Sequence, residues 1–181
     1  MPERLLLHCC CAPCASAVLE VLMPSFDVTV LFYNPNIQPR AEYDKRRAEL
    51  NRLLGFAQYA DVGTAACEYD RDAFETVCAA LRDAPEGGLR CVECFKLRLG
   101  ETARLAAAGG YDCFTTTLSV SPHKNAKLLN ELGDTLAQQY GAEYLHADFK
   151  KRDGFKRSIE LSKQFGLYRQ SYCGCLTSFA P

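Results

Sequence analysis

The stretch that decides the fold is RLLLHCCCAPCASAVLEVLMPSFDVTVLFY, residues 4–33. It opens with Arg4–Cys9, a short apolar run that predicts a buried strand. Ala15–Met23 follows with the composition of a helix, and Asp27–Tyr33 is rich in β-branched and aromatic residues, which favours a second strand. A strand, a helix and a strand in this order indicate a parallel pair joined by a right-handed crossover.

The rest of the chain continues this alternation. It contains no internal repeat, low-complexity tract or linker that would mark a second domain. We therefore predict one α/β domain over residues 1–181, with a parallel sheet of about five strands flanked by helices. Ser121 before Pro122 resembles a helix start. The further elements expected are helices at Ala41–Leu54, Asp72–Arg82, Cys94–Ala108, Asn125–Tyr140 and Gly154–Phe165, and strands at Ala57–Val62, Tyr111–Leu118 and Glu143–Asp148.

The composition excludes several classes of protein. Of 181 residues, 48% are apolar and 24% are charged, and the formal net charge is −1. This apolar content excludes a disordered chain, and the charge balance excludes a surface that binds polyanions as a whole. No segment has the pattern of a spanning helix or a secretion signal, so we expect a cytoplasmic protein without a membrane partner. In that reducing compartment, 11 cysteines indicate metal or redox chemistry.

Two cysteine pairs have the spacing of metal ligands. Cys11 and Cys14 lie where the first strand meets the first helix, and Cys91 and Cys94 form a second pair. Amides at a helix start favour thiolates, and four thiolates select zinc or an iron–sulfur cluster. The gap between the pairs is far wider than in a zinc ribbon, so one centre would join distant parts of the fold.

A third arrangement, Cys173-Gly174-Cys175, lies near the C-terminus. A disulfide between thiols one residue apart closes a small, strained ring, which makes it redox-active rather than structural. Tail ligands or inert thiols remain the alternative. The unpaired cysteines are predicted to be small core residues; they are Cys67, Cys78 and Cys113.

Polar residues follow three of the predicted strands. Ligands of open parallel sheets bind beyond the carboxyl ends of the strands, so Cys9–Cys14, Tyr33–Gln38 and Thr115–Asn125 are expected to converge. The candidates to line a pocket there are Tyr33, Asn34, Asn36, Thr115, Thr116 and Thr117.

A basic stretch is the candidate nucleic-acid surface. Residues 146–170 carry seven basic and three acidic side chains, and aromatic residues such as Phe155 lie among them. Base stacking beside phosphate contacts is how single-stranded nucleic acid is held, although an ordinary solvated helix face has the same charges. The phosphate-binding candidates are Lys150, Lys151, Arg157 and Arg169.

Two other functions are compatible with parts of this pattern. One is a zinc-stabilised nucleic-acid-binding module without catalysis. The other is a thioredoxin-like thiol oxidoreductase, in which Cys11 and Cys14 alone would form the redox pair.

Five segments together resemble the cobalamin-independent epoxyqueuosine reductase family. They are LLLHCCCAPC (5–14), FYNPNI (32–37), EGGLRCVECFKLRL (86–99), TTTLSVSPHKN (115–125) and RSIELSKQFGLYRQSYCGC (157–175). The resemblance implies an oxidoreductase that reduces epoxyqueuosine to queuosine at the tRNA wobble position, the last step of queuosine biosynthesis. It also implies a fold similar to the adenine-nucleotide hydrolase-like (HUP) domains.

The same resemblance implies cofactors, partners and site residues. A 4Fe–4S cluster would be held by Cys10, Cys11, Cys91 and Cys94. A mononuclear iron or other metal ion would lie beside it, with Cys14 among its ligands. Cys173 and Cys175 would form the redox-active disulfide. The implied partners are a tRNA that carries epoxyqueuosine in its anticodon loop and an electron donor.

Overall fold

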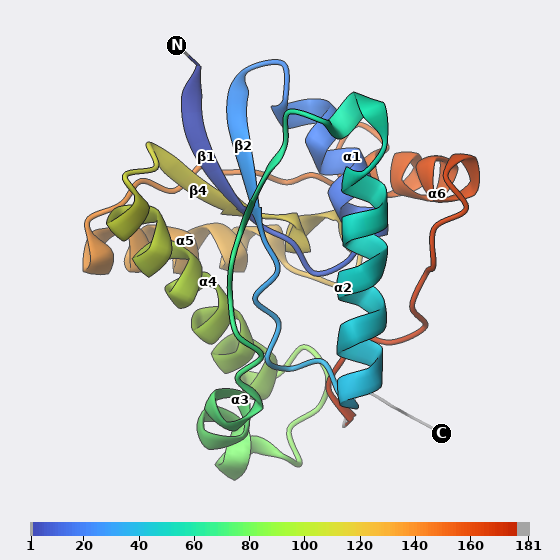
Figure 1. Ribbon diagram of the computed structural model, residues 1–181. Helices are drawn as coiled ribbons and strands as arrows, with labels where there is room; N and C mark the ends of the chain where they lie inside the picture. Colours follow the sequence, from blue (N-terminus) through green and yellow to red (C-terminus); the bar gives the residue numbers. More distant parts are fainter. Residues whose placement is uncertain (1, 177–181) are drawn as a thin grey trace.

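A four-stranded parallel sheet forms the centre of the computed structural model, which describes residues 2–176 (Figure 1). The strand order is β3-β2-β1-β4. Within it, His8 at the end of β1 pairs with Leu31 of β2 and Thr116 of β4, so three strands end at the same edge. The strands are β1 (Glu3–His8), β2 (Phe26–Leu31), β3 (Gly63–Ala65) and β4 (Cys113–Thr116).

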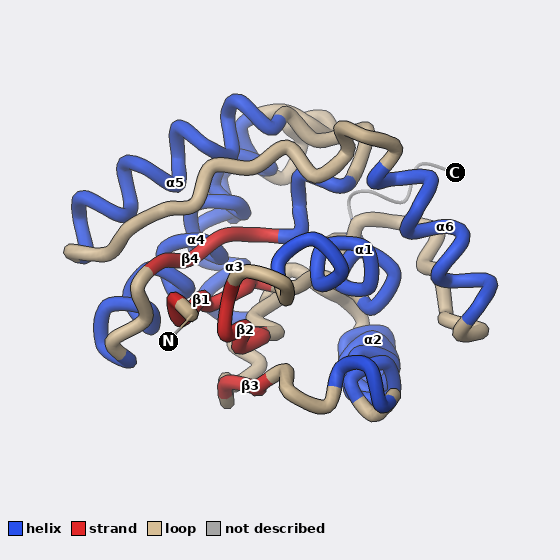
Figure 2. The backbone as a smooth tube through the Cα atoms, turned by 90° about the horizontal axis from the view of Figure 1, so that it is seen from above, coloured by secondary structure: helices blue, strands red, loops and turns tan. Residues whose placement is uncertain are grey.

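Helices cover both faces of the sheet (Figures 1 and 2). Leu5 and Leu7 of β1 belong to a core with the helices α1 and α2, whereas Leu6 belongs to a second core with α4 and α5. Since successive strand residues point to opposite faces, the unbroken leucine run is the pattern of a strand buried on both sides. The helices are α1 (Ala12–Leu22), α2 (Arg40–Leu54), α3 (Arg71–Cys78), α4 (Leu89–Gly109), α5 (Ala126–Tyr140) and α6 (Gly154–Gln164).

The predicted α/β architecture is confirmed, and two helices begin earlier than expected. α1 begins at Ala12 with Cys11 as its N-cap, so the cysteine run enters the first helical turn. α4 begins at Leu89 rather than Cys94, which places Cys91 and Cys94 one turn apart at its start. Cys91 therefore lies in the first turn of α4 and Cys94 in the second, so the favourable effect of the helix N-terminus on negative charge reaches Cys91 but not Cys94.

The sheet has four strands rather than the five expected. Ala57–Val62, expected as a strand, begins instead with the 3-10 helix Ala57–Tyr59, and the strand in this region is Gly63–Ala65. Tyr111–Leu118 is a strand only over Cys113–Thr116, because the Thr116 hydroxyl caps a 3-10 helix over Thr117–Val120.

The segment Glu143–Asp148 was expected to be the fifth strand, and it forms only a single bridge between Phe114 and Tyr144. Beyond this bridge side chains satisfy the backbone: Ala147 N donates to the Asn130 side chain, and the Thr115 hydroxyl donates to Leu145 O. These bonds replace the ladder that a fifth strand would need.

The start of α5 also differs from expectation. Asn125 caps this helix, since its Oδ1 accepts hydrogen bonds from Lys127 N and Leu128 N. Ser121 and Pro122 instead lie in the preceding turn. Within residues 2–176, no helix combines the length and apolar character required to cross a membrane.

Candidate functional site

A cavity of about 640 Å³ opens beyond the carboxyl ends of β1 and β4. Cysteines from the start of α1 form one wall, and the segment that precedes Gly174 forms another. Charged and amide side chains complete the lining. The lining residues that carry the argument below are Cys10, Cys11, Cys14, Arg98, Lys124, Gln170 and Cys173.

Cys10, Cys11 and Cys14 form a compact thiol group, called the cysteine triad below. Their sulfur atoms all lie within 4.8 Å of one another, and the Sγ atoms of Cys10 and Cys11 are 3.8 Å apart. Thr117 supports this geometry, because Cys10 N donates a 3.3 Å hydrogen bond to its hydroxyl oxygen. Three convergent thiols at a helix N-terminus can bind a metal ion.

The triad favours a thiolate at Cys10. Hydrogen bonds from the thiols of Cys11 and Cys14 hold the pKa of Cys10 well below its ordinary value, and Arg98 and Lys124 add positive charge. Donation to Cys10 raises the pKa of Cys11 to about 12 and also raises that of Cys14. One anionic sulfur is thus stabilised by two neutral ones, and a metal ion would take the place of their protons.

Arg98 is a buried cation beside the thiols. Its side chain donates from Nη2 to Asn34 Oδ1 at 2.7 Å, and Nη1 lies 3.9 Å from Cys94 Sγ. Its Nε lies 3.4 Å from Nε2 of His8, and burial, reinforced by this guanidinium, lowers the pKa of His8 to about 3. His8 and Asn34 are neutral partners, so the buried positive charge of Arg98 has to be balanced by a negative charge nearby. Cysteine thiolates supply that charge.

A second, smaller cavity is lined by four cysteines. They are Cys91 and Cys94 of α4 together with Cys173 and Cys175. Burial raises the pKa of Cys94 to about 12 and that of Cys91 above its ordinary value. Gly87 N donates a 3.3 Å hydrogen bond to Cys91 Sγ.

Cys173 connects the two cavities, because it lines both of them. Cys173 is a reduced thiol in this structure. Gly174, the next residue, has φ +142°, and a Cβ there would lie 2.9 Å from both Asn36 Nδ2 and Ile37 Cγ1. The segment can therefore pass this close to the β2–α2 loop only with glycine at position 174.

The chemistry of the donors fits a thiolate-bound metal centre. Two buried amide oxygens, Asn36 Oδ1 and Gln170 Oε1, have no hydrogen-bond partner among the described residues. Asn36 lines the smaller cavity and Gln170 the larger one. These oxygens are acceptors that a hydrogen-bond donor such as water satisfies, and the soft donors available to a metal are the cysteine sulfurs.

The pocket residues expected from the sequence are largely buried beneath the cavity. Asn34 donates to Cys9 O, Thr115 to Leu145 O, and the Thr116 oxygen lies 2.9 Å from Nδ1 of His8. Tyr33 packs in the core beside α4, and burial raises its pKa to about 12. Of this set, Asn36 lines a cavity.

Of the four basic candidates, Arg169 lines the larger cavity, and the other three do not. Arg157 is paired with Glu20 and Glu160, and Lys150 with Asp148. Arg169 lines the cavity and donates to Ser158 O and Ser162 Oγ, with its guanidinium 5.8 Å from the Phe155 ring centroid. Lys151 is exposed.

Three site residues were not identified from the sequence, namely Arg98, Lys124 and Gln170. Arg98 follows Cys94 by four positions, so helical spacing after the cysteine pair was the available signal. Lys124 and Gln170 carry no such signal, because only the fold brings them to the cysteines. Cys78, expected in the core, is buried and packs in a small cluster with Cys94 and Cys175.

The sequence matches one protein family over almost its whole length. Residues 5–180 match the family described as epoxyqueuosine reductase QueH. The protein of that name from Staphylococcus epidermidis is 41% identical, over 96% of this chain and 75% of the relative. Those of Thermotoga maritima and Dehalococcoides mccartyi are each 36% identical, over 96% and 98% of this chain and 88% and 93% of the relatives. The chain therefore belongs to the epoxyqueuosine reductase QueH family.

Proposed function

We propose that this protein reduces epoxyqueuosine in tRNA to queuosine. The observation that carries the proposal is Cys173, which lines both thiol cavities of a chain that belongs to this family. Removing an epoxide oxygen to leave an alkene and water consumes two electrons and two protons. A site for this reaction has to combine redox groups with proton donors, and here cysteines and Lys124 would supply them.

Cys10, Cys11, Cys91 and Cys94 would hold a 4Fe–4S cluster, and Cys14 would bind a neighbouring mononuclear iron or other metal ion. The cysteine triad and the two α4 cysteines supply the soft sulfur donors that such groups require. When bound, the cluster would relay electrons singly, without being their net source. Arg98, which contacts Cys94 and interacts electrostatically with Cys10, would balance the charge of these thiolates.

Cys173 and Cys175 would act as the redox-active pair. Two thiols that become one disulfide release two electrons and two protons, which is what one epoxide consumes on conversion to an alkene and water. An electron donor must then return the disulfide to two thiols. Since Cys173 faces both cavities, its thiol can exchange electrons with a group in either.

Lys124 would assist the departing oxygen. Burial opposes its charge, but Coulombic attraction to the sulfur atoms of Cys173 and Cys10 outweighs burial and raises the pKa of Lys124. Its ammonium group therefore remains protonated at neutral pH. A cation in the cavity lining stabilises negative charge that develops on the epoxide oxygen.

The tRNA would approach over the mouth of the larger cavity. Phe155 is 37% exposed and lines this cavity, which suits it to stack on an unpaired base of the anticodon loop. Exposed Lys151 and Lys156 lie near it in sequence and would contact phosphates, together with Arg169. Asn34, Thr115 and Thr116 would support the floor of the site through their hydrogen bonds.

The test is reduction of epoxyqueuosine in isolated tRNA by anaerobically purified protein, followed by nucleoside mass spectrometry. We expect conversion to queuosine, with about four irons and matching sulfide per chain. An additional iron or other metal would correspond to the mononuclear site. One zinc without sulfide, and no conversion after cluster reconstitution, would instead favour the zinc-stabilised binding module.

Serine variants assign the metal ligands. Cys10→Ser, Cys11→Ser, Cys91→Ser and Cys94→Ser should each lower cluster content, and Cys14→Ser should remove the additional metal alone. Cys67→Ser is the matched control, because Cys67 lies outside both cavities and its thiol donates to Phe32 O. Cys173→Ser should keep the cluster and stop multiple turnover. Loss of iron from that variant would identify Cys173 as a ligand.

A further inference from the structure

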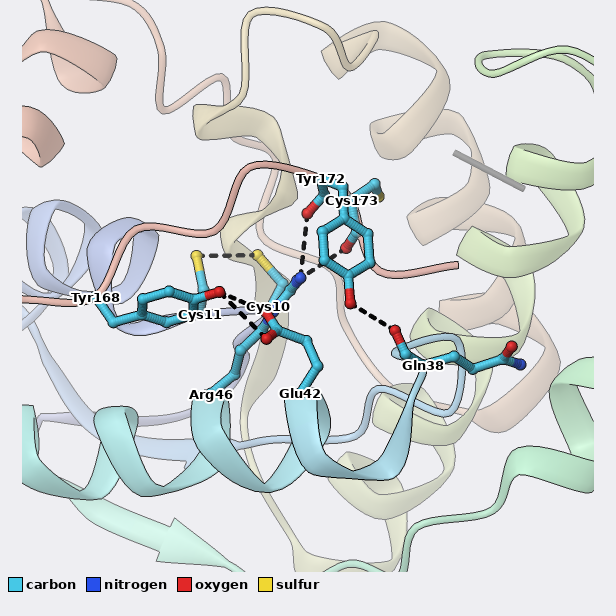
Figure 3. A network of polar contacts seen from close by, with 8 residues as sticks. All are labelled: Cys10, Cys11, Gln38, Glu42, Arg46, Tyr168, Tyr172 and Cys173. Carbon is cyan, nitrogen blue, oxygen red and sulfur yellow. Dashed lines mark hydrogen bonds and ion pairs between the residues drawn. The ribbon is translucent and has the colours of Figure 1, made fainter. Parts of the chain in front are cut away.

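A buried arginine holds the segment that carries the redox pair. Arg46 of α2 is fully enclosed, with 1% of its side chain exposed. Its Nη1 donates to Cys173 O at 3.0 Å and its Nη2 to Tyr172 O at 3.2 Å (Figure 3). Its Nε donates to Glu42 Oε1 at 2.7 Å. One guanidinium thus binds two successive carbonyls and one carboxylate.

Further hydrogen bonds attach the same segment to α2 and to the loop between β2 and α2. We call this segment, Tyr168–Cys175, the C-terminal strap. The Tyr168 hydroxyl donates to Glu42, and that of Tyr172 donates to Gln38 O (Figure 3). Gln38 N donates to Gly174 O at 2.8 Å. The Tyr172 ring also lies 4.9 Å from the Arg46 guanidinium carbon. The carbonyls of residues 172, 173 and 174 are therefore all engaged, while the Cys173 side chain lines the cavities.

Arginine is suited to this position for a geometric reason. Its planar guanidinium presents several donors in one rigid arrangement, whereas a lysine ammonium is a compact point charge. Lysine at position 46 could keep the ion pair with Glu42, but it could not bind Glu42 and both carbonyls with the same geometry. Because Arg46 is buried, water cannot replace a hydrogen-bond partner that it loses. Its three hydrogen bonds therefore hold the strap in one position.

We infer that Arg46 is a positioning residue: its buried guanidinium anchors the C-terminal strap to α2 and so sets Cys173 between the two cavities. The anchoring itself is independent of the reaction. Its consequence for turnover rests on the proposed function, in which Cys173 and Cys175 are the redox pair.

The test compares Arg46→Met and Arg46→Lys with Arg47→Met. Arg47 is the neighbouring arginine of the same helix and is exposed, so its variant controls for loss of charge on α2. Amide hydrogen exchange is measured on the full chain by mass spectrometry. The regions compared are the strap, the loop between β2 and α2 that contains Gln38, and the central strands β1 and β2. In Arg46→Met we expect at least a tenfold rise in exchange for the strap and the Gln38 amide, with the amides of β1 unchanged. Arg46→Lys should give a smaller rise in the same places.

Turnover is measured on the same three proteins with epoxyqueuosine-containing tRNA. We expect kcat of both Arg46 variants to fall at least tenfold while KM for the tRNA stays within twofold, and Arg47→Met to match the unaltered protein. If Arg46→Met does not fold, Arg46→Lys and Glu42→Gln supply the same comparison, because each alters the network while keeping a buried polar group.

Three outcomes would overturn the inference. One is an unchanged strap exchange in the Arg46 variants, and another is an equal rise throughout the sheet, which would mean general destabilisation. The third is a loosened strap with unchanged kcat. Absence of conversion by the unaltered protein would refute the proposed function instead, and the exchange result would still decide whether Arg46 anchors the strap.

Discussion

The guanidinium of Arg98 lies against the thiol of Cys94, with Nη1 3.9 Å from Sγ. Within residues 2–176, no carboxylate forms an ion pair with Arg98. Coulombic attraction to the sulfur atoms of Cys94, Cys10 and Cys173 raises the pKa of Arg98 against the effect of burial. The Arg98 guanidinium therefore interacts electrostatically with cysteines that line both cavities.

Arg98→Met should weaken metal binding. The variant removes the charge that offsets repulsion between thiolates, so metal affinity should fall by about tenfold to a hundredfold, as for other groups that support metal ligands. Competition with a chelator measures this affinity. Arg104→Met, at an exposed position of the same helix, is the control. Equal affinity in the Arg98 variant and the control would show that the guanidinium does not support the centre.

Lys124→Met should slow reduction without loss of metal. The ammonium group that stabilises the oxygen would be absent, so kcat should fall by about a hundredfold. Iron content and the thermal midpoint should match those of Lys127→Met, a variant of an exposed lysine on α5. Full activity of Lys124→Met would mean that another group serves the oxygen.

Phe155→Ala should weaken tRNA binding by about 1–3 kcal/mol, the range for one stacked base. Lys156→Ala should weaken binding at low salt and reduce the slope of log affinity against log salt by about 0.7 for a single-stranded contact. Filter binding across a salt series distinguishes the loss of stacking in Phe155→Ala from the loss of a phosphate contact in Lys156→Ala, because only the second changes the salt slope. Arg104→Ala serves as the control, and equal binding by all three variants would place the tRNA on another surface.

Arg157→Ala should behave differently from Lys156→Ala. Arg157 donates to both oxygens of Glu20 at 2.8 Å and so joins α6 to α1. Its removal should lower the free energy of unfolding slightly, because solvent screens an ion pair at an exposed position. Urea denaturation measures this change, and a larger effect on the salt slope of tRNA binding than that of Lys156→Ala would contradict the assignment.

The bond between Glu49 and the strap should make stability depend on acidic pH. A hydrogen bond from Arg52, together with one from Tyr168 N at 2.6 Å, holds the pKa of Glu49 below its ordinary value of 4.5. The folded state thus favours the carboxylate, and its contribution is present above pH 4.5 and lost as pH falls through the lowered pKa.

Glu49→Gln should therefore cost about 1 kcal/mol at pH 7 and progressively less below pH 4.5. Urea unfolding at both acidic and neutral pH measures the difference, with Glu68→Gln, at an exposed position, as control. A difference between wild type and Glu49→Gln that does not change with pH would mean that the carboxylate charge is not what stabilises this contact.

Local patterns were sufficient to predict most of the fold. The leucine run before His8 and the alternation of strands and helices indicate a parallel sheet covered on both faces, and the structure confirms it. Pattern reasoning failed at Glu143–Asp148, where the residues have strand character. Whether a segment joins a sheet depends on distant partners, and here Asn130 and Thr115 satisfy its backbone instead.

The sequence by itself determined the chemistry of the site: cysteine spacing at strand ends and helix starts specifies soft thiolate donors, because these depend on residue type and local backbone. Only the tertiary structure decided the grouping. It set Cys173 in the lining of both cavities, placed Arg98 in the lining of the larger one, and bound the carbonyls of Tyr172 and Cys173 to Arg46. Burial removes solvent and brings together residues about a hundred positions apart, and neither effect can be read from neighbours along the chain.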